Sequence, residues 1–411
     1  MKKITQVSMI GLGKLGLACA EVMSLKYNVT GYDIYPRHSD KITISESLSE
    51  ATQGKDIIFV AVQTPHDPIY DGSQPIIHLP NKDFDYTIVS QVLEEINQYV
   101  TSDQLVVLIS TVLPGTTRKK LRKHITNARF IYNPYLIAMG SVDWDMVNPE
   151  MVIIGTEDGS LTGDAKLLTD FYKPLMENNP RFEIGTWDEA ESIKIFYNTF
   201  ISTKIGLVNM ILDVAIKNGN IDVDIVTNAL AHSTTRIMSS KYMTAGMGDG
   251  GPCHPRDNIA LRWAAEQLDL GYDIFNVIMK AREQQACNIA KYLIELQQEH
   301  NLPIVIHGKS YKPNIELTSG SYSLLIGSYL QKLNAKFMYC DPLTNDIVDD
   351  ISAIVLLAHN CQVTYGYTGD MPDQKLYFEP GENSVIVDPW RKFATTNKSF
   401  KVIHYGNTRL K

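Results

Sequence analysis

Cys253 lies in a segment that is suited to displaying a thiol. The segment runs Gly250-Gly251-Pro252-Cys253-His254-Pro255-Arg256-Asp257. Two glycines allow the backbone to approach a ligand closely, and two prolines stiffen the turn that carries the sulfur. A buried structural cysteine is the alternative, because free cysteine often packs as a small hydrophobe. The segment by itself leaves both readings open, so the choice depends on what else the chain carries.

A glycine-rich turn near the N-terminus indicates a dinucleotide site. Val7–Ile10 predicts a strand, Leu17–Met23 predicts a helix, and Gly11-Leu12-Gly13-Lys14-Leu15-Gly16 stands between them. The three glycines allow a tight turn, close approach of a pyrophosphate and close packing of helix on strand. Asp33 ends the next predicted strand, where its carboxylate can accept hydrogen bonds from a ribose 2′-hydroxyl and would repel a 2′-phosphate. We therefore expect NAD rather than NADP, and a nucleotide site with a displayed thiol suggests redox chemistry.

A third group of polar residues lies in the middle of the chain. Lys194 and Asn198 are four residues apart in a helical stretch, which places them on one helix face. An ammonium and an amide there could stabilise an alkoxide near Cys253, although a solvated helix face explains the spacing equally simply. Asp257 could either begin a helix or orient a catalytic water. His254 is interpreted as structural or close to the substrate, because adjacent side chains generally point apart.

Composition limits the class of protein. The chain has 411 residues, which predicts two or three domains, and 44% hydrophobic with 20% charged residues is typical of a globular protein. A net charge of −8 argues against a nucleic-acid partner, and we expect no basic stripe. The five cysteines form no CxxC pair, so neither disulfides nor a metal site are indicated. We find no leader-like segment and no apolar run of membrane-spanning length, and we expect a cytoplasmic protein without a membrane partner.

Hydrophobic patterning predicts an α/β fold in three parts. Short apolar runs alternate with helical stretches as far as Met151–Ile154, which is typical of a parallel sheet covered by helices on both faces. From about Trp187 to Lys217 a long helix without proline is expected, and helices continue to Leu296. The α/β pattern returns at Ile304–Ile306. We predict a Rossmann NAD-binding domain over 1–186, a helical region over 187–298 and a Rossmann-like domain over 299–411.

The whole chain resembles the nucleotide-sugar dehydrogenases typified by UDP-glucose 6-dehydrogenase and GDP-mannose dehydrogenase. The order of the matching motifs along the chain is also the order in the family. The matching motifs are Gly11–Gly16 with Asp33, Val60–Pro65, Ser110–Thr116, Asn133-Pro134, Ala190–Asn198, Arg236-Ile237, Gly250–Asp257 and Tyr311–Asn314.

The resemblance implies a role for each matched residue. Cys253 would be the nucleophile, assisted by Lys194, Asn198, Asp257 and Thr111. NAD would be contacted by Gly11, Leu12, Gly13, Lys14, Leu15, Gly16, Asp33, Thr64 and Thr111. The UDP-sugar would be held by Lys194, Asn198, Gly250, Tyr311, Lys312, Arg391, Tyr242 and Arg236, the last reaching across a homodimer formed through the long helix. The terminal domain would bind the UDP portion of the substrate.

The implied reaction is a four-electron oxidation of the C6 hydroxyl to an acid through a Cys253 thiohemiacetal and thioester. UDP-glucose is the first candidate substrate, with a UDP-N-acetylhexosamine or GDP-mannose as alternatives. A two-electron hydroxyacid-type dehydrogenase would not require the Cys253 segment or a second α/β domain. A nucleotide-sugar sensor without catalysis is the remaining alternative. The number of NADH molecules formed per sugar, two, one or none, separates the three.

This chain also departs from the family pattern. Asn133-Pro134-Tyr135-Leu136-Ile137-Ala138-Met139-Gly140 lacks the two glutamates that flank this run in the family, one of which is implicated in thioester hydrolysis. Thr318–Ser321 replaces an arginine that touches NAD, for which Arg37 could compensate. Pro252-Cys253-His254 and Asp388–Arg391 also differ from the commonest forms of these two motifs in the family. We expect a divergent subfamily with slow hydrolysis of the thioester.

Overall fold

We describe a computed structural model of the chain, which covers residues 4–65, 67–70, 74–75, 77–138, 140–251, 253–365, 374–397 and 399–408. It divides into two compact units, Met1–Lys204 and Ile205–Lys411, and each is described by itself. Met139 and Pro252, which belong to the sequence motifs above, lie outside the described residues.

The first unit is built on a sheet that is parallel apart from one strand pair. Among the described residues this sheet has eight strands in the order β3-β2-β1-β4-β5-β6-β7-β8. Its strands are β1 (Gln6–Ile10), β2 (Asn28–Tyr32), β3 (Thr43–Ile44), β4 (Ile57–Val60), β5 (Leu105–Leu108), β6 (Arg129–Tyr132), β7 (Met151–Thr156) and β8 (Arg181–Thr186). β6 and β7 pair antiparallel, which the alternation of strands and helices did not predict. The predicted strands are otherwise confirmed, whereas β3 and β8 were missed.

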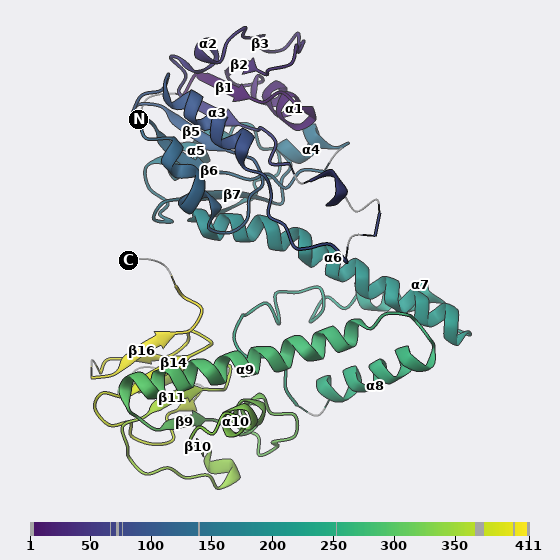
Figure 1. Cartoon of the computed structure of the whole chain (residues 1–411), viewed down its shortest axis with the longest axis vertical. Coiled ribbons are helices and arrows are strands. Elements are labelled where there is room, and N and C mark those ends of the chain that lie inside the picture. Colours follow the sequence, from purple (N-terminus) through teal and green to yellow (C-terminus); the bar gives the residue numbers. More distant parts are fainter. Residues whose placement is uncertain are drawn as a thin grey trace. The chain divides into compact units, whose positions relative to one another are not determined.

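Helices cover both faces of this sheet. They are α1 (Lys14–Met23), α2 (Leu48–Thr52), α3 (Thr87–Asn97), α4 (Val142–Val147) and α5 (Asp164–Tyr172), with short turns η1 (Pro68–Tyr70), η2 (Thr117–Leu121) and η3 (Arg122–His124). One core joins α1 and α5 to the sheet through Met23 and Phe171, and a second core joins α2 and α3 through Leu48 and Leu93. Figure 1 shows α1 and α4 lying side by side. The two cores hold the carboxyl ends of the strands, where the predicted cofactor residues lie.

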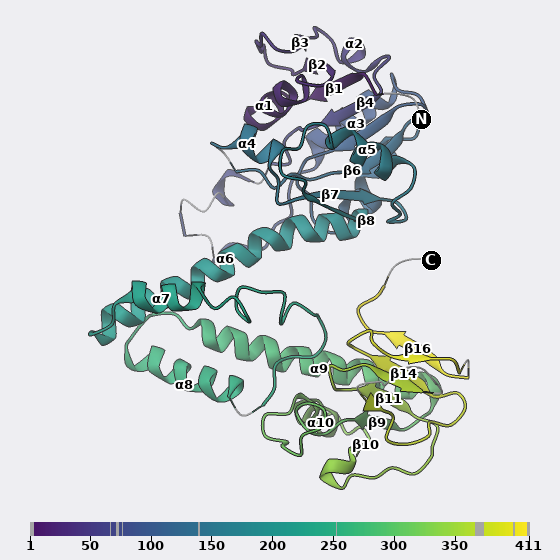
Figure 2. The same cartoon turned by 180° about the vertical axis from the view of Figure 1, so that it is seen from behind.

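The second unit contains a smaller parallel sheet. In the part of the chain that the structure describes, this sheet has five strands in the order β10-β9-β11-β14-β16. They are β9 (Ile304–His307), β10 (Phe337–Cys340), β11 (Ile354–Leu357), β14 (Val385–Asp388) and β16 (Lys401–His404), beside a small sheet of β12 (Val363–Tyr365), β13 (Gln374–Lys375) and β15 (Ala394–Thr395). The helices are α7 (Val223–Ala231), α8 (His254–Gln267), α9 (Ile274–His300) and α10 (Tyr322–Lys332), with the turn η4 (Pro342–Thr344). α9 and α10 pack on one face of the five-stranded sheet (Figure 2).

The two sheets repeat the same local design. Gly11 follows β1 with a φ of 92°, and Gly308 follows β9 with a φ of 97°. In each case an aspartate at the end of the neighbouring strand accepts the next backbone N–H. Asp33 accepts from Leu12 at 2.7 Å, and Asp341 accepts from Lys309 at 2.9 Å. Both sheets therefore share one arrangement of a strand, a glycine turn and an aspartate from the neighbouring strand.

The long helix α6 (Trp187–Asn218) was predicted with nearly these bounds. Phe196, Phe200, Ile205 and Ile216 are exposed by 64%, 52%, 53% and 69%, so its apolar residues are largely uncovered. By length and composition alone α6 could cross a membrane, with an 18-residue window of mean hydropathy 1.5 of which 11% is buried. The sequence analysis expected no apolar run of that length, and α6 passes this test although Lys204 and Asp213 interrupt its apolar residues.

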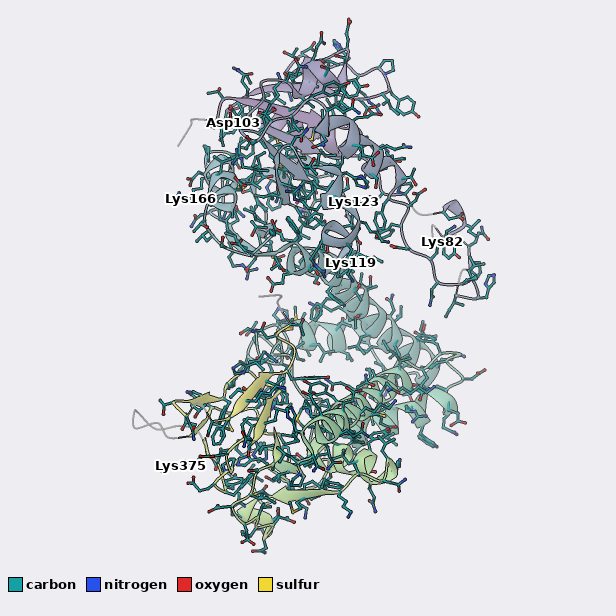
Figure 3. The ribbon with its side chains drawn as sticks, turned by 60° about the vertical axis from the view of Figure 1, so that its left-hand side comes forward. Lys82, Asp103, Lys119, Lys123, Lys166 and Lys375 are labelled. Carbon is teal, nitrogen blue, oxygen red and sulfur yellow. The ribbon has the colours of Figure 1, made fainter. Side chains whose placement is uncertain are left out.

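A basic segment in the first unit also differs from expectation. Arg118–His124 carries cationic residues at every position except Leu121, and Figure 3 shows Lys119 and Lys123 on this unit. Two of its charges have acidic partners, Arg118 with Asp188 at 2.6 Å and Lys120 with Asp83 at 2.8 Å, and Nδ1 of His124 lies 2.7 Å from the Glu94 carboxylate. The segment is basic in sequence, but neighbouring acids match part of its charge.

Candidate active site

The glycine turn of the first unit forms a cradle with room for a ligand. A Cβ added at Gly11 would lie 2.8 Å from the carbonyl oxygen of Ala61, and one at Gly16 would lie 1.9 Å from that of Gly11. A Cβ at Gly13 would meet no atom within 4 Å. Gly11 and Gly16 are thus required by close packing, whereas Gly13 keeps the turn open for a phosphate group.

Asp33 stands beside this turn at the end of β2. Its Oδ2 accepts the Leu12 N–H at 2.7 Å and its Oδ1 accepts the Tyr35 N–H at 2.9 Å, while Arg37 lies 3.5 Å away. Gly11, Gly13, Asp33 and Arg37 line a cavity of about 240 Å³. The shape and donor set fit a dinucleotide. Leu12 is 1% exposed, so its side chain supports the turn from the core.

Thr64 and Thr111 lie next to each other beyond the ends of β4 and β5. The Thr64 hydroxyl donates to the Thr111 carbonyl oxygen at 2.7 Å. The loop that follows Thr111 is held by Glu191 of α6, whose carboxylate accepts the N–H groups of Gly115 at 2.5 Å and Thr117 at 2.6 Å. Burial raises the pKa of Glu191, and the hydrogen bonds from Thr117 and Gly115 oppose that shift. Sequence reasoning missed Glu191, although it lies three residues before Lys194 on the same helix.

Lys194 and Asn198 project from the same stretch of α6, as predicted. The Lys194 ammonium donates to the Tyr135 carbonyl oxygen at 2.7 Å, and burial lowers its pKa. Asn198 is exposed. A lysine whose charge is partly desolvated gives up its proton more readily than a free one, so it is suited to moving a proton or stabilising an oxyanion.

The segment that lacks the family glutamates packs into the core of the first unit. The Tyr135 hydroxyl hydrogen-bonds with that of Tyr172 at 2.8 Å, and the Tyr172 hydroxyl donates to the Asn133 side chain at 2.5 Å. Burial raises the pKa of Tyr135 well above its usual range. An acid at position 135 would therefore replace a packed, hydrogen-bonded aromatic side chain.

Cys253 lies in the second unit, at the N-terminal cap of α8. It is exposed and is not in a disulfide, so the structural alternative of a buried cysteine is not what the fold has. Arg256 donates to Oδ1 of Asp257 at 2.9 Å, and this contact, together with the nearby Cys253, raises the pKa of Arg256. Asp257 is thus paired with a cation beside the thiol.

The glycines before Cys253 are explained by three aromatic rings. A Cβ at Gly246 would lie 2.4 Å from the Trp390 ring, and one at Gly248 would lie 2.3 Å from the Tyr322 ring. Gly251 has a φ of 85°, and a Cβ there would lie 2.9 Å from the Tyr311 ring. Side chains are excluded at these positions because the segment is pressed against the walls of the cavity described next.

A cavity of about 890 Å³ opens beside Cys253 within the second unit. Six predicted residues line it, and they are Arg236, Tyr242, Gly250, Cys253, Tyr311 and Lys312. The sequence analysis did not assign Lys241, Asp249, Asn360 or Trp390 to the site, and these also line it. Cations beside aromatic rings suit a ligand that combines phosphate groups with flat or apolar surfaces.

Two further predicted substrate residues belong to the second unit. Arg236 lines the cavity of its own chain, and its expected reach into a partner's site stays a prediction. Arg391 donates to the carbonyl oxygens of Ala245 at 2.5 Å and Tyr405 at 3.1 Å, and also to that of Pro389. Its guanidinium donates to these backbone carbonyls and holds the chain around Ala245, and its contact with the substrate stays a prediction.

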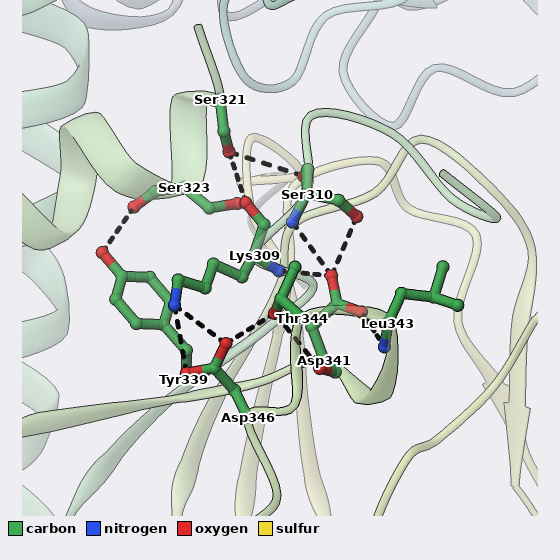
Figure 4. A network of polar contacts seen from close by, with 9 residues as sticks. All are labelled: Lys309, Ser310, Ser321, Ser323, Tyr339, Asp341, Leu343, Thr344 and Asp346. Atoms are coloured by element: carbon green, nitrogen blue, oxygen red, sulfur yellow. Dashed lines mark hydrogen bonds and ion pairs between the residues drawn. The ribbon is translucent and has the colours of Figure 1, made fainter. Parts of the chain in front are cut away.

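The loop that carries Tyr311 and Lys312 is fixed by a buried aspartate. Oδ2 of Asp341 accepts the N–H groups of Lys309 and Ser310, both at 2.9 Å, and the Ser310 hydroxyl at 2.8 Å (Figure 4). Burial alone would raise the pKa of Asp341, but these hydrogen bonds lower it below its ordinary value. The carboxylate therefore orders the loop, and the loop presents Lys312 to the cavity.

The predicted site residues thus fall into two groups. Gly11, Asp33, Thr64, Thr111, Lys194 and Asn198 belong to the first unit, and Arg236, Tyr242, Cys253, Asp257, Tyr311 and Lys312 belong to the second. Each group is ordered internally as described above. The first group forms a dinucleotide cradle with a lysine, and the second lines a cavity with an exposed thiol; the dinucleotide cradle is typical of the class of NAD-dependent dehydrogenases.

Comparison with known proteins gives the family. Residues 35–176 match the NAD binding domain of the UDP-glucose/GDP-mannose dehydrogenase family, and residues 188–284 match its central domain. The chain belongs to this family, and its N-terminal domain is the family's NAD-binding domain. Cys253, Lys194 and Asp257 lie within the matched residues, whereas the glycine turn and Asp33 precede them.

Individual relatives are distant. The UDP-glucose 6-dehydrogenase YwqF of Bacillus subtilis is 27% identical over 310 residues, which cover 74% of this chain and 66% of that protein. The UDP-glucose 6-dehydrogenase of Rickettsia prowazekii is 24% identical, over 82% of this chain and 81% of its own. A ternary complex of GDP-mannose dehydrogenase from Pseudomonas aeruginosa superimposes with a TM-score of 0.75 at 19% identity, covering 97% of this chain and 99% of that one. The chain spans about two thirds of the length of YwqF.

Proposed function

We propose that this protein is an NAD-dependent nucleotide-sugar 6-dehydrogenase that oxidises the C6 hydroxymethyl group of a UDP-sugar to a carboxylate, with UDP-glucose as the first candidate. The observation that carries the proposal is the exposed Cys253 at a helix N-terminus, on the wall of an 890 Å³ cavity lined by cations and aromatic rings. Family membership supports the same reaction class.

The reaction would proceed in two oxidations at one carbon. The alcohol loses a hydride and a proton to become an aldehyde, and the Cys253 thiolate adds to the aldehyde carbon to form a thiohemiacetal. Loss of a second hydride and proton gives a thioester, and water releases the acid and the thiol. NAD, when bound, accepts one hydride in each oxidation. Covalent attachment keeps the aldehyde from leaving between the two oxidations.

The chain's own residues have distinct tasks in this scheme. Lys194 and Asn198 would stabilise the oxyanion of each intermediate, and the lowered pKa of Lys194 lets it give up its proton near neutral pH more readily than a free lysine. Asp257 would orient the hydrolytic water. Both Arg256 contacts are to Oδ1 of Asp257, and Oδ2 has no partner among the described residues. Thr111 would position the same water.

The nucleotide would be held away from the reacting carbon. Arg236 and Lys312 line the cavity with Tyr311 and Trp390, so phosphate groups and a base have matching surfaces. Binding of that large group orients the sugar and contributes to catalysis at C6. The absence of the family glutamates near Tyr135 predicts slow hydrolysis of the thioester.

Counting NADH per sugar consumed tests the proposal, using UDP-glucose, a UDP-N-acetylhexosamine and GDP-mannose. Two NADH per sugar, with a rapid burst of about two per site followed by a slower phase, is the expected result for the true substrate. Intact-mass analysis of quenched samples should find the thioester on Cys253. One NADH per sugar indicates a two-electron dehydrogenase, and no turnover with tight binding of a nucleotide sugar indicates a sensor.

A further inference from the structure

An ion pair that no step of the proposed reaction uses lies directly behind the Cys253 segment. Arg282 projects from α9, and its Nε donates to Oδ1 of Asp249 at 2.6 Å. The Arg282 side chain is 9% exposed and that of Asp249 is 33% exposed. A buried guanidinium needs several acceptors to offset its lost hydration, so its full set of contacts indicates what it holds in place.

The Arg282 guanidinium joins three segments. Besides the Asp249 carboxylate, it donates to the Asp249 carbonyl oxygen at 3.1 Å and to the Gly320 carbonyl oxygen at 3.4 Å. Gly251 donates its N–H to the same Gly320 carbonyl at 3.3 Å. The cysteine segment and the start of α10 are therefore tied to α9 and to each other.

The surroundings make this junction tight. The Tyr322 ring lies 5.1 Å below the Arg282 guanidinium, and its hydroxyl donates to the Arg282 carbonyl oxygen at 2.8 Å. Gln285, one helical turn further along α9, donates to the Gly246 carbonyl oxygen at 2.9 Å. The segment from Gly246 to Gly251 is thus fastened to α9 at Gly246 and at Asp249.

Asp249 also faces the residue after the thiol. Its second oxygen, Oδ2, lies 3.8 Å from Nδ1 of His254. The carboxylate thus stands between a buried cation and the first residue of α8. Movement of Asp249 would shift the segment between it and His254, which includes Cys253.

We propose that Arg282 and Asp249 form a clamp that positions Cys253 in the substrate cavity. The clamp fixes the glycine-rich segment, which has little conformational preference of its own, so that the thiol stays at the N-terminus of α8. Both are positioning residues, since they act through the backbone that carries the thiol. The inference rests on the proposed function only for its kinetic readout.

Hydrogen exchange tests the clamp without requiring turnover. In Arg282→Gln, amide exchange in peptides covering 246–251 and 318–322 is expected to accelerate at least tenfold, while the strands β9 and β11 keep their protection. Arg262→Gln is the matched control, because Arg262 lies in the same unit and its Asp273 partner is 3.6 Å away. Amide exchange in Arg282→Lys should be intermediate between that of the wild type and that of Arg282→Gln, since an ammonium can pair with Asp249 but cannot bridge all three acceptors.

Steady-state kinetics gives the second readout. A misplaced thiol is expected to lower kcat on the order of 10- to 100-fold while KM for NAD stays within about twofold. If Arg282→Gln does not fold, Asp249→Asn provides the same test, because it keeps an acceptor and loses the charge. Unchanged exchange in both peptides of a folded variant overturns the clamp, and faster exchange with unchanged kcat overturns its positioning role. If the wild-type protein has no dehydrogenase activity, the proposed function fails and the exchange result still decides the clamp.

Discussion

Replacing Glu191 with glutamine is expected to destabilise the first unit measurably. Glu191 is fully buried and accepts two backbone N–H groups, from Gly115 and Thr117, across a loop that contains the Thr111 motif. A glutamine has one acceptor oxygen in place of two, so one N–H keeps a partner and the other faces an NH₂ group. A buried donor left without an acceptor costs about 1–3 kcal/mol, and hydrogen bonds to a charged group are at the upper end of that range.

The expected cost of Glu191→Gln is reduced by one opposing effect. Burial raises the pKa of Glu191, which means that the ionised carboxylate itself destabilises the folded state to some extent. The neutral glutamine avoids that cost. We therefore expect a loss of about 2 kcal/mol in unfolding free energy at neutral pH.

Urea unfolding followed by circular dichroism measures this loss, and hydrogen exchange in the 111–121 peptide locates it. Asp188→Asn is the control, because Asp188 precedes Glu191 on the same helix and pairs with Arg118 at 2.6 Å while both side chains remain over a third exposed. Such a surface pair contributes at most about 1 kcal/mol. A Glu191→Gln protein as stable as the control, with normal exchange in the loop, would refute the argument that Glu191 fixes it.

Four further outcomes are expected. Cys253→Ser should retain NAD binding but form no acid, because a hydroxyl does not readily give the acyl intermediate; near-normal turnover would exclude covalent catalysis. NAD should bind more tightly than NADP in a calorimetric titration because of Asp33, and the reverse order would contradict that role. Burial lowers the folded-state pKa of Lys194 below 10.5, so the stability of the wild type relative to Lys194→Met should rise as the pH increases from that lowered pKa to 10.5. Over the same interval it should fall as the pH decreases. Denaturation experiments at two pH values that show no such difference would disprove this prediction. Light scattering should detect a dimer formed through the exposed apolar side chains of α6, and a fully active monomer would overturn this.

Several site residues could be predicted from local sequence because their signals are local. Gly11 and Gly16 are required by contacts within one strand-turn-helix unit, and the spacing of three glycines records those contacts. Lys194 and Asn198 share a helix face because they are four residues apart. Gly251 could be noticed beside Cys253, but the need for glycine at positions 246, 248 and 251 could not be predicted, since the rings that exclude a side chain come from Tyr311, Tyr322 and Trp390.

Other features could not be predicted because their partners are distant in sequence. Glu191 and Gly115 are separated by 76 residues, and Asp249 and Arg282 by 33, so no local pattern indicates either contact. Arg391 was assigned to the substrate because of its motif, and that motif does not indicate its hydrogen bonds to three carbonyl oxygens. The antiparallel pairing of β6 with β7 was missed for a related reason: apolar runs indicate strands but not their directions.

The sequence by itself determined most strands of the first sheet, the glycine turn of the dinucleotide cradle and the long helix from Trp187, because each depends on residues within a few positions of one another. The tertiary structure decided which charged side chains hydrogen-bond to the backbone of loops and which functional groups stay accessible to a ligand. That division follows from burial: Asp341, Glu191 and Arg282 are withdrawn from water and must bind nearby backbone groups, whereas Cys253 stays exposed at a helix end.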